Sequence, residues 1–293
     1  MYELMQITAR DYYIECPARM GLVRGEGNGV YLIDSGNDKD AGKKVLRILE
    51  GQGWQLKAIL NTHSHADHIG GNRFLQEKTG CEIYAMGLER LYAASPVLEP
   101  AGLWGGLPFR ELRSKFLMAQ ESRVLPLETF VLPHMLRAIP LPGHCFEMTG
   151  FLTEDGTAYI ADCVSSPETL EKYGVGYLWD PEAALKTLEA LPDLGAGMYV
   201  PAHAPVTADI RPLAALNREK LLTLKADILE FCEAPTTFEG LLKRVFDRYG
   251  MTMNAQQYAL IGSTLRSWLS CLYSRGEVRF AFRDNEMLWQ AAQ

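Results

Sequence analysis

Seven consecutive residues, 62–68, constrain this chain more than any other stretch of its sequence. They read Thr-His-Ser-His-Ala-Asp-His, so four side chains of metal-binding type lie within six positions, and they include three of the six histidines. Neighbouring residues on a regular strand or helix point in different directions, so Asp67 and His68 can face one cavity only on an irregular turn. Gly70 and Gly71 permit such a turn. Because burying three imidazoles and a carboxylate without a cation is costly, the stretch predicts a metal-binding turn.

Further residues of metal-binding type follow segments with the pattern of a strand. The turn itself follows a buried strand pattern at residues 56–60. The others are His144 after residues 135–141, Asp162 after residues 157–161, His203 after residues 198–200 and Asp34 after residues 29–33. Ligand sites form where strands end, so we expect these side chains to meet at one edge of a sheet.

The pattern divides the chain into two parts. Residues 1–212 mix strand and helix signals, whereas residues 213–293 read as nearly continuous helix closed by two short apolar runs. Helices followed by a terminal hairpin indicate a helical, winged-helix-like module at residues 213–293, set apart from an α/β domain at residues 1–212. Residues 87–133 look mainly helical, and we expect an insertion there that acts as a lid or substrate wall.

Composition excludes several classes of protein. With 293 residues, 47% of them hydrophobic and 22% charged, the chain is neither disordered nor fibrous and is long enough for one or two cores. A formal net charge of −7 argues against broad, sequence-independent binding to nucleic acid or to an anionic membrane. No signal peptide and no membrane span is recognisable, so we expect a cytoplasmic protein that binds no membrane.

In this order the residues resemble the five motifs of the metallo-β-lactamase superfamily of metal-dependent hydrolases, over residues 1–212. The resemblance implies a four-layer αββα sandwich with the site at one edge of the two sheets. It also implies a dinuclear metal centre, in which Asp34 supports the histidine loop without binding a metal. The first metal would be held by His63, His65 and His144, the second by Asp67, His68 and His203, and both by Asp162.

The residue types indicate which cofactors and chemistry this centre would have. Imidazole and carboxylate ligands without a thiolate suit two zinc ions, which we expect, and also iron, manganese or cobalt. Such cations lower the pKa of water from 15.7 towards about 7, so a hydroxide between them can attack a carbonyl carbon or a phosphorus without a serine or cysteine nucleophile. We expect Asp67 to be the catalytic residue that orients this hydroxide.

Departures within the motifs narrow the choice of branch. The best-known zinc β-lactamases have a cysteine where Asp162 stands, and flavodiiron oxygen reductases have a glutamate where His65 stands. The remaining groups are hydroxyacylglutathione hydrolase-like thioesterases, and phosphodiesterases and nucleases such as the β-lactamase-like protein 2 group, whose winged-helix-like tail is similar. Residues 216–293 carry ten Lys and Arg against nine Asp and Glu, which is poor support for binding nucleic acid.

We therefore predict a hydrolase of a small ester or thioester. A phosphodiesterase or nuclease that holds nucleic acid with its tail is the alternative. The helical tail is equally compatible with a homodimer, and the sequence does not identify the substrate.

Overall fold

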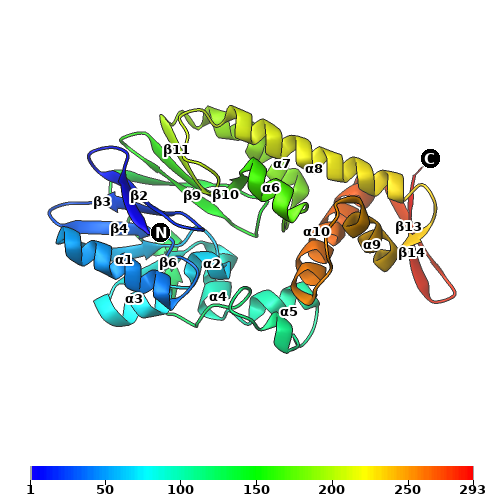
Figure 1. Ribbon diagram of the computed structural model, residues 1–293, viewed down its shortest axis with the longest axis horizontal. Helices are drawn as coiled ribbons and strands as arrows, with labels where there is room; N and C mark the ends of the chain where they lie inside the picture. Colours follow the sequence, from blue (N-terminus) through cyan, green and yellow to red (C-terminus); the bar gives the residue numbers. More distant parts are fainter. Residues whose placement is uncertain (1, 293) are drawn as a thin grey trace.

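The computed structural model describes residues 2–292 and has two β-sheets packed face to face (Figure 1). The first sheet has seven strands in sequence order, antiparallel from β1 to β4 and parallel from β4 to β7. They are β1 (Glu3–Gln6), β2 (Asp11–Glu15), β3 (Met20–Arg24), β4 (Gly29–Ile33), β5 (Gln55–Leu60), β6 (Glu82–Ala85) and β7 (Val124–Pro126).

The second sheet has four strands in the order β11-β10-β9-β8. They are β8 (Leu136–Pro140), β9 (Thr149–Thr153), β10 (Thr157–Ser165) and β11 (Met198–His203). The pairing of β10 with β11 is parallel and the other two pairings are antiparallel. Each sheet therefore has parallel strands at one edge, β4 to β7 in the first sheet and β10 with β11 in the second.

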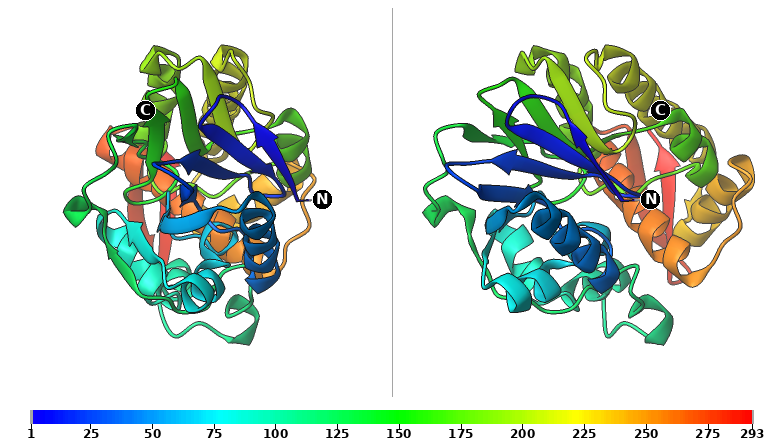
Figure 2. Two further views of the ribbon diagram at one scale, coloured as in Figure 1. Left: turned by 90° about the vertical axis from the view of Figure 1, so that its left-hand side faces the viewer. Right: turned by 60° about the vertical axis from the view of Figure 1, so that its left-hand side comes forward.

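Three apolar clusters show how the layers pack. Between the sheets lie buried side chains of both, among them Ile33, Leu60, Phe151 and Tyr159. A second cluster joins the outer face of the first sheet to α1 (Lys39–Gln52) and α3 (Asn72–Thr79). A third cluster joins the second sheet to α7 (Pro181–Ala190) and to the start of α8 (Arg211–Phe231). The views in Figure 2 show this order of helices, sheet, sheet and helices. The fold is an α/β sandwich of mixed sheets, as expected.

Residues 87–133 differ from the mainly helical segment predicted for them. The helices α4 (Gly87–Ala94) and α5 (Leu98–Trp104) and a 3-10 turn at Arg110–Leu112 fill the first half. The second half contains β7, which pairs in parallel with β6 at the edge of the first sheet, and a 3-10 turn at Leu127–Thr129. Val124 is buried in the core of that sheet. The segment is thus built into the sandwich rather than simply inserted into a loop.

The C-terminal residues form three helices and a small sheet. The helix α8 is followed by β12 (Thr236–Thr237), α9 (Phe238–Arg248), α10 (Ala255–Ser274), β13 (Val278–Arg283) and β14 (Glu286–Ala291), with the strands in the order β12-β14-β13. Their own core includes Ile228, Leu241 and Trp268. The boundary expected at residues 212–213 falls in the first turn of α8, whose start packs on the sandwich and whose end packs in this second core.

The C-terminal part returns to the sandwich through α10. Figure 1 shows α10 running down to α5, and Leu103 and Leu112 share a buried cluster with Ala259 there. The side-chain amide of Gln256 donates to the hydroxyl of Ser114 at 2.7 Å. The C-terminal helices and residues 98–114 therefore form one continuous wall beside the sandwich.

Smaller differences concern single elements. The strand β2, the one-turn helix α2 (Ala66–Ile69) and α6 (Pro167–Tyr173) are not predicted from the sequence. Helix α1 is capped by Asp38 and α9 by Thr237. All six cysteines are free thiols and four are buried. Among residues 2–292, no helix has the length and apolarity to cross a membrane.

Candidate metal centre

The histidine-rich turn leaves the end of β5 and passes through α2 into α3. Gly70 and Gly71 have ordinary helical φ angles of −62° and −86°, so the backbone conformation does not require glycine at either position. Both are needed because there is no space for a side chain. A Cβ atom on Gly70 would lie 2.3 Å from the carbonyl carbon of Asn37, and one on Gly71 would lie 2.3 Å from the carbonyl oxygen of Ser35. The turn therefore packs directly on the loop after β4, and this packing brings the residues that follow β4 and β5 together.

The structure brings the seven predicted ligand residues together in two adjacent groups. Within each group the candidate ligand atoms lie within 4.8 Å of one another. One group consists of His63, His65, His144 and Asp162, and the other of Asp67, His68 and His203. In the first group Nδ1 of His65 lies 3.0 Å from Nε2 of His63 and 3.0 Å from Nε2 of His144. Each group has the size and donor types of a site for one divalent cation.

Asp162 lies between the two groups. Its Oδ2 atom is 3.4 Å from Nε2 of His144 and 3.3 Å from Nε2 of His203, and its Oδ1 atom is 3.0 Å from Nε2 of His68. The carboxylate projects from inside β10, not from beyond its end as the sequence predicts. The pairing of β10 with β11 shifts register around Ala161, which has a φ of 47°. This irregularity turns Asp162 toward the histidines while the strand continues.

Asp34 lies behind the second group. Its carboxylate accepts hydrogen bonds from the backbone N–H of Thr62 at 2.8 Å, from the Thr62 hydroxyl at 2.7 Å and from Nδ1 of His68 at 2.8 Å. Since Nδ1 of His68 is engaged in this way, its Nε2 faces Asp67 and Asp162. Asp34 itself is only 3% exposed and contacts candidate ligands from behind, His68 directly and His63 through the Thr62 hydroxyl, which lies 2.9 Å from Nδ1 of His63.

Burial and neighbouring charges shift the pKa values of the histidines in opposite directions. Burial lowers the pKa of His144 to about 3 and holds that of His63 well below its usual value, so both rings are neutral at pH 7, as metal binding requires. Burial alone would also lower the pKa of His203, but the carboxylates of Asp162 and Asp67 outweigh it and raise the pKa to about 10. Without metal, a proton on this imidazole balances part of the negative charge.

The donor set fits divalent cations. Nε2 of His68 and Oδ1 of Asp162 are buried, face each other at 3.0 Å and have no hydrogen-bond partner within the described chain. No Lys or Arg among residues 2–292 pairs with the carboxylates of Asp34, Glu89, Glu99 or Asp162, although all four are largely buried. Buried carboxylates without a cationic partner are costly, so bound divalent cations would supply the charge that the protein lacks.

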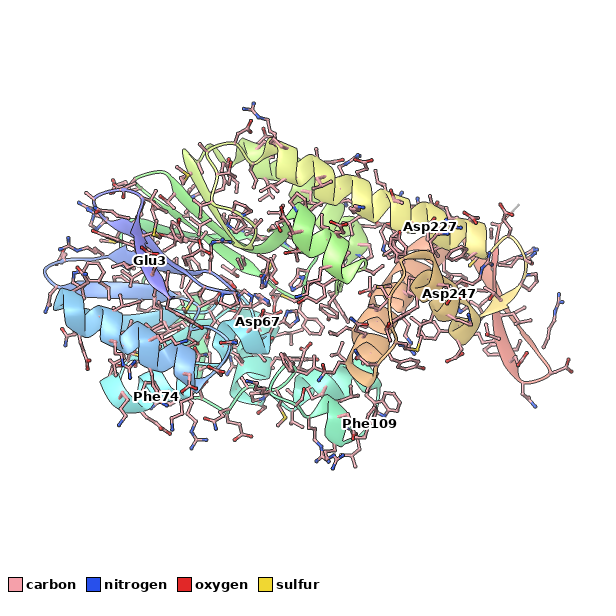
Figure 3. All side chains as sticks on the ribbon, viewed as in Figure 1. Glu3, Asp67, Phe74, Phe109, Asp227 and Asp247 are labelled. Carbon is pink, nitrogen blue, oxygen red and sulfur yellow. The ribbon has the colours of Figure 1, made fainter. Side chains whose placement is uncertain are left out.

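Three neighbours of the centre are missing from the predicted site. Glu89 on α4 and Glu99 on α5 reach the histidine turn from the side. The ring of Tyr177 lies edge-on to His65 and His144, with centroids 5.1 Å and 5.7 Å away. The two glutamates are ordinary polar residues in a helical pattern and give no signal in the sequence. Figure 3 shows the centre, marked by Asp67, at the end of the sandwich that faces the C-terminal helices.

Comparison with known proteins decides the family. Residues 13–203 match the metallo-beta-lactamase superfamily. The chain belongs to this superfamily. It is a metal-dependent hydrolase of the metallo-beta-lactamase fold, as its relatives are. A hydroxyacylglutathione hydrolase of Methylococcus capsulatus is 30% identical over 217 residues, which are 69% of this chain and 74% of that protein. One of Rhodopseudomonas palustris is 28% identical over 155 residues, 51% of this chain and 49% of that protein.

Solved structures show that the likeness includes the C-terminal part. A beta-lactamase domain protein from Burkholderia ambifaria superposes on 99% of this chain and 94% of its own, with a TM-score of 0.72 and 17% identity. A metallo-beta-lactamase family protein from Thermus thermophilus covers 99% of this chain and 98% of its own, with a TM-score of 0.71 and 21% identity. The metallo-beta-lactamase SMB-1 matches only 75% of this chain but 95% of its own, with a TM-score of 0.56 and 20% identity. At these identities the likeness shows the fold alone.

Proposed function

We propose that this superfamily member hydrolyses a small thioester, or a related ester, with two divalent metal ions, zinc being the expected one. His63, His65 and His144 would hold one ion and Asp67, His68 and His203 the other, with Asp162 between them. The observation that carries the proposal is the position of Asp162, whose two carboxylate oxygens reach both groups of histidines. This arrangement is what a dinuclear centre requires and what a mononuclear one does not.

The ions, when bound, supply Lewis acidity and lower the pKa of water from 15.7 towards about 7. The protein supplies orientation. Asp67 has the most exposed side chain of the seven, at 42%, and only its Oδ2 atom approaches a neighbour, 3.3 Å from Nε2 of His203. Its other oxygen is therefore available to orient a water molecule. The ring of Tyr177 restricts the opposite side, next to His65 and His144.

The choice of a thioester rests on the relatives. Several similar proteins are named hydroxyacylglutathione hydrolases, and their names describe the thioester of a hydroxy acid with glutathione. We therefore expect the natural substrate to carry a hydroxyacyl group on a thiol. A thiolate is a good leaving group, so no dedicated proton donor at the leaving atom is needed.

A nuclease role has less support. A nuclease would use residues 213–293, whose helices are followed by a hairpin, but many of their cations are already paired. Among the ten Lys and Arg of residues 216–293, five form ion pairs with acidic side chains, namely Arg218, Lys225, Lys243, Arg248 and Arg275. Electrostatic binding of phosphates needs free cations on one face. We propose instead that the module forms a wall of the substrate site through α10.

The test is a substrate panel with the metal-loaded chain. We expect an S-(2-hydroxyacyl)glutathione to be hydrolysed with a kcat/KM at least about 100-fold above that for bis-p-nitrophenyl phosphate. The kcat/KM for a lactone should lie between these two values. Asp67→Asn should lower kcat by about 100-fold or more, because it weakens a metal ligand and misplaces the water that Asp67 orients. Asp193→Asn, an exposed aspartate far from the turn, is the matched control. A preference for the phosphodiester, or full activity of Asp67→Asn, would contradict the proposal.

A further inference from the structure

Helices α4 and α5 each place a carboxylate in the interior beside the metal centre. Glu89 on α4 is completely buried and Glu99 on α5 is 7% exposed. Neither belongs to the two groups of candidate ligands. Within residues 2–292 no Lys or Arg forms an ion pair with either one, although carboxylates without a cation are rarely buried. A role at the centre would explain why the chain keeps both.

Glu89 joins the two loops that carry the histidines of the first group. Its Oε2 atom accepts hydrogen bonds from the backbone N–H and the hydroxyl of Ser64, at 2.9 Å and 2.6 Å. Its Oε1 atom accepts from the backbone N–H of Glu147 at 3.2 Å. Ser64 separates His63 from His65, and Glu147 lies three residues after His144, so one carboxylate fixes the spacing of all three imidazoles.

The loop after His144 also forms a hydrogen bond with the start of helix α4. The carboxylate of Glu147 accepts a hydrogen bond from the backbone N–H of Leu88 at 2.5 Å, at the start of α4. Helix α4 and this loop are therefore connected in both directions, by Glu89 to the backbone of the loop and by Glu147 to the backbone of the helix. A segment held in this way to the ligand loops cannot swing open without moving His144.

Glu99 faces the other nitrogen of His65. Nδ1 of His65 points toward the first group, 3.0 Å from Nε2 of both His63 and His144, whereas Nε2 lies 3.6 Å from Oε1 of Glu99. That separation is slightly too long for a hydrogen bond. A carboxylate on this side favours the tautomer with its proton on Nε2, which leaves the lone pair on Nδ1 for a metal.

We propose that Glu89 and Glu99 are positioning residues of the first metal site, and that α4 and α5 form a fixed part of the metal centre. The inference rests on the proposed function because it requires the first metal site to exist, but it does not depend on which substrate is hydrolysed. It replaces the lid role expected for residues 87–133: changes in the first half of this segment will alter metal affinity as well as substrate binding. Glu99 acts through His65 and Glu89 through Ser64 and Glu147 beside the histidines, and neither acts on substrate.

The experiment is a cobalt titration of the full chain and of variants, followed by absorption and by competition with a chromophoric chelator. Glu99→Gln keeps the shape of the side chain and removes its charge, and Glu89→Gln places an amide N–H against a backbone N–H. Each of the two glutamine variants should bind Co²⁺ about 10- to 100-fold more weakly at one of the two sites and should shift the visible Co²⁺ bands. Losing a residue that orients a metal ligand has an effect of this size. Glu121→Gln, an exposed glutamate of the same segment, should bind like the wild type.

The thermal midpoint of the metal-free protein separates positioning from mere structural support. For Glu99→Gln it should stay the same or rise, because a buried charge is removed, while the midpoint with Co²⁺ falls. Wild-type affinity and spectrum in both glutamine variants would overturn the inference, as would a wild-type chain that binds no Co²⁺ at all. If the chain binds Co²⁺, the variants behave as expected and no thioester is hydrolysed, the proposed substrate is wrong and the positioning role stands.

Discussion

Nδ1 of His68 donates a hydrogen bond to the carboxylate of Asp34 at 2.8 Å, and both side chains are buried. The same carboxylate holds the backbone N–H and the hydroxyl of Thr62, at the start of the histidine-rich turn. Asp34 has a φ of 63°, in the left-handed region, immediately after β4. One strained residue thus joins the ends of two parallel strands and sets which nitrogen of His68 faces the second group of ligands.

Asp34→Asn should impair the second metal site with little effect on the fold. Asparagine tolerates the left-handed conformation, but its amide nitrogen cannot accept from Thr62 or His68. We expect a loss of about 10- to 100-fold in the affinity for one of the two metal ions, with a comparable fall in kcat/KM. Chelator competition and steady-state kinetics measure these. Asp193→Asn is the matched control, and an Asp34→Asn variant within about twofold of wild type in both quantities would contradict this role.

Thr264→Val should weaken the connection between the C-terminal helices and the site. The Thr264 hydroxyl on α10 accepts from the backbone N–H of Leu178 at 2.9 Å and donates to the carbonyl of Gly176 at 3.1 Å, on either side of Tyr177. Thr264 is 1% exposed and Leu178 8%, so the lost bond leaves the buried backbone N–H of Leu178 unpaired. We expect the free energy of unfolding to fall by about 1–3 kcal/mol, measured in urea, and kcat/KM to fall as Tyr177 shifts.

Thr223→Val is the control for this variant. Thr223 bonds only to a carbonyl of its own helix, α8, on the exposed side. Its replacement should change stability by less than about 0.5 kcal/mol. Equal stabilities of the two variants would show that α10 does not hold the Tyr177 loop.

Much of the centre is predictable because its ligands are local in sequence or follow strands. His63, His65, Asp67 and His68 lie on one turn, and their types and spacing are sufficient to predict a metal site. His144 and His203 are placed by the general rule that sites form at strand ends. Asp162 follows this rule only in part, because an irregularity within β10 is what turns it inward.

The surroundings of the centre are not predictable in the same way. Glu89 and Glu99 look like surface residues of short helices, and only the packing of α4 and α5 against the turn buries them. The strand β7 is three residues long and carries no clear alternation, so its pairing with β6 is visible only in the folded chain. The return of α10 to residues 98–114 is likewise a long-range contact without a local signal.

Metal content tests the central claim most directly. The chain, purified after growth with zinc, manganese and iron and analysed by mass spectrometry for elements, should carry two divalent ions per chain. Removing them with a chelator should abolish hydrolysis and lower the thermal midpoint, since a ligand at about 100 times its Kd stabilises by about 2.7 kcal/mol. His203→Ala should retain one ion. A chain that holds no metal and takes none up, or that saturates at a single ion with full activity, would contradict the account.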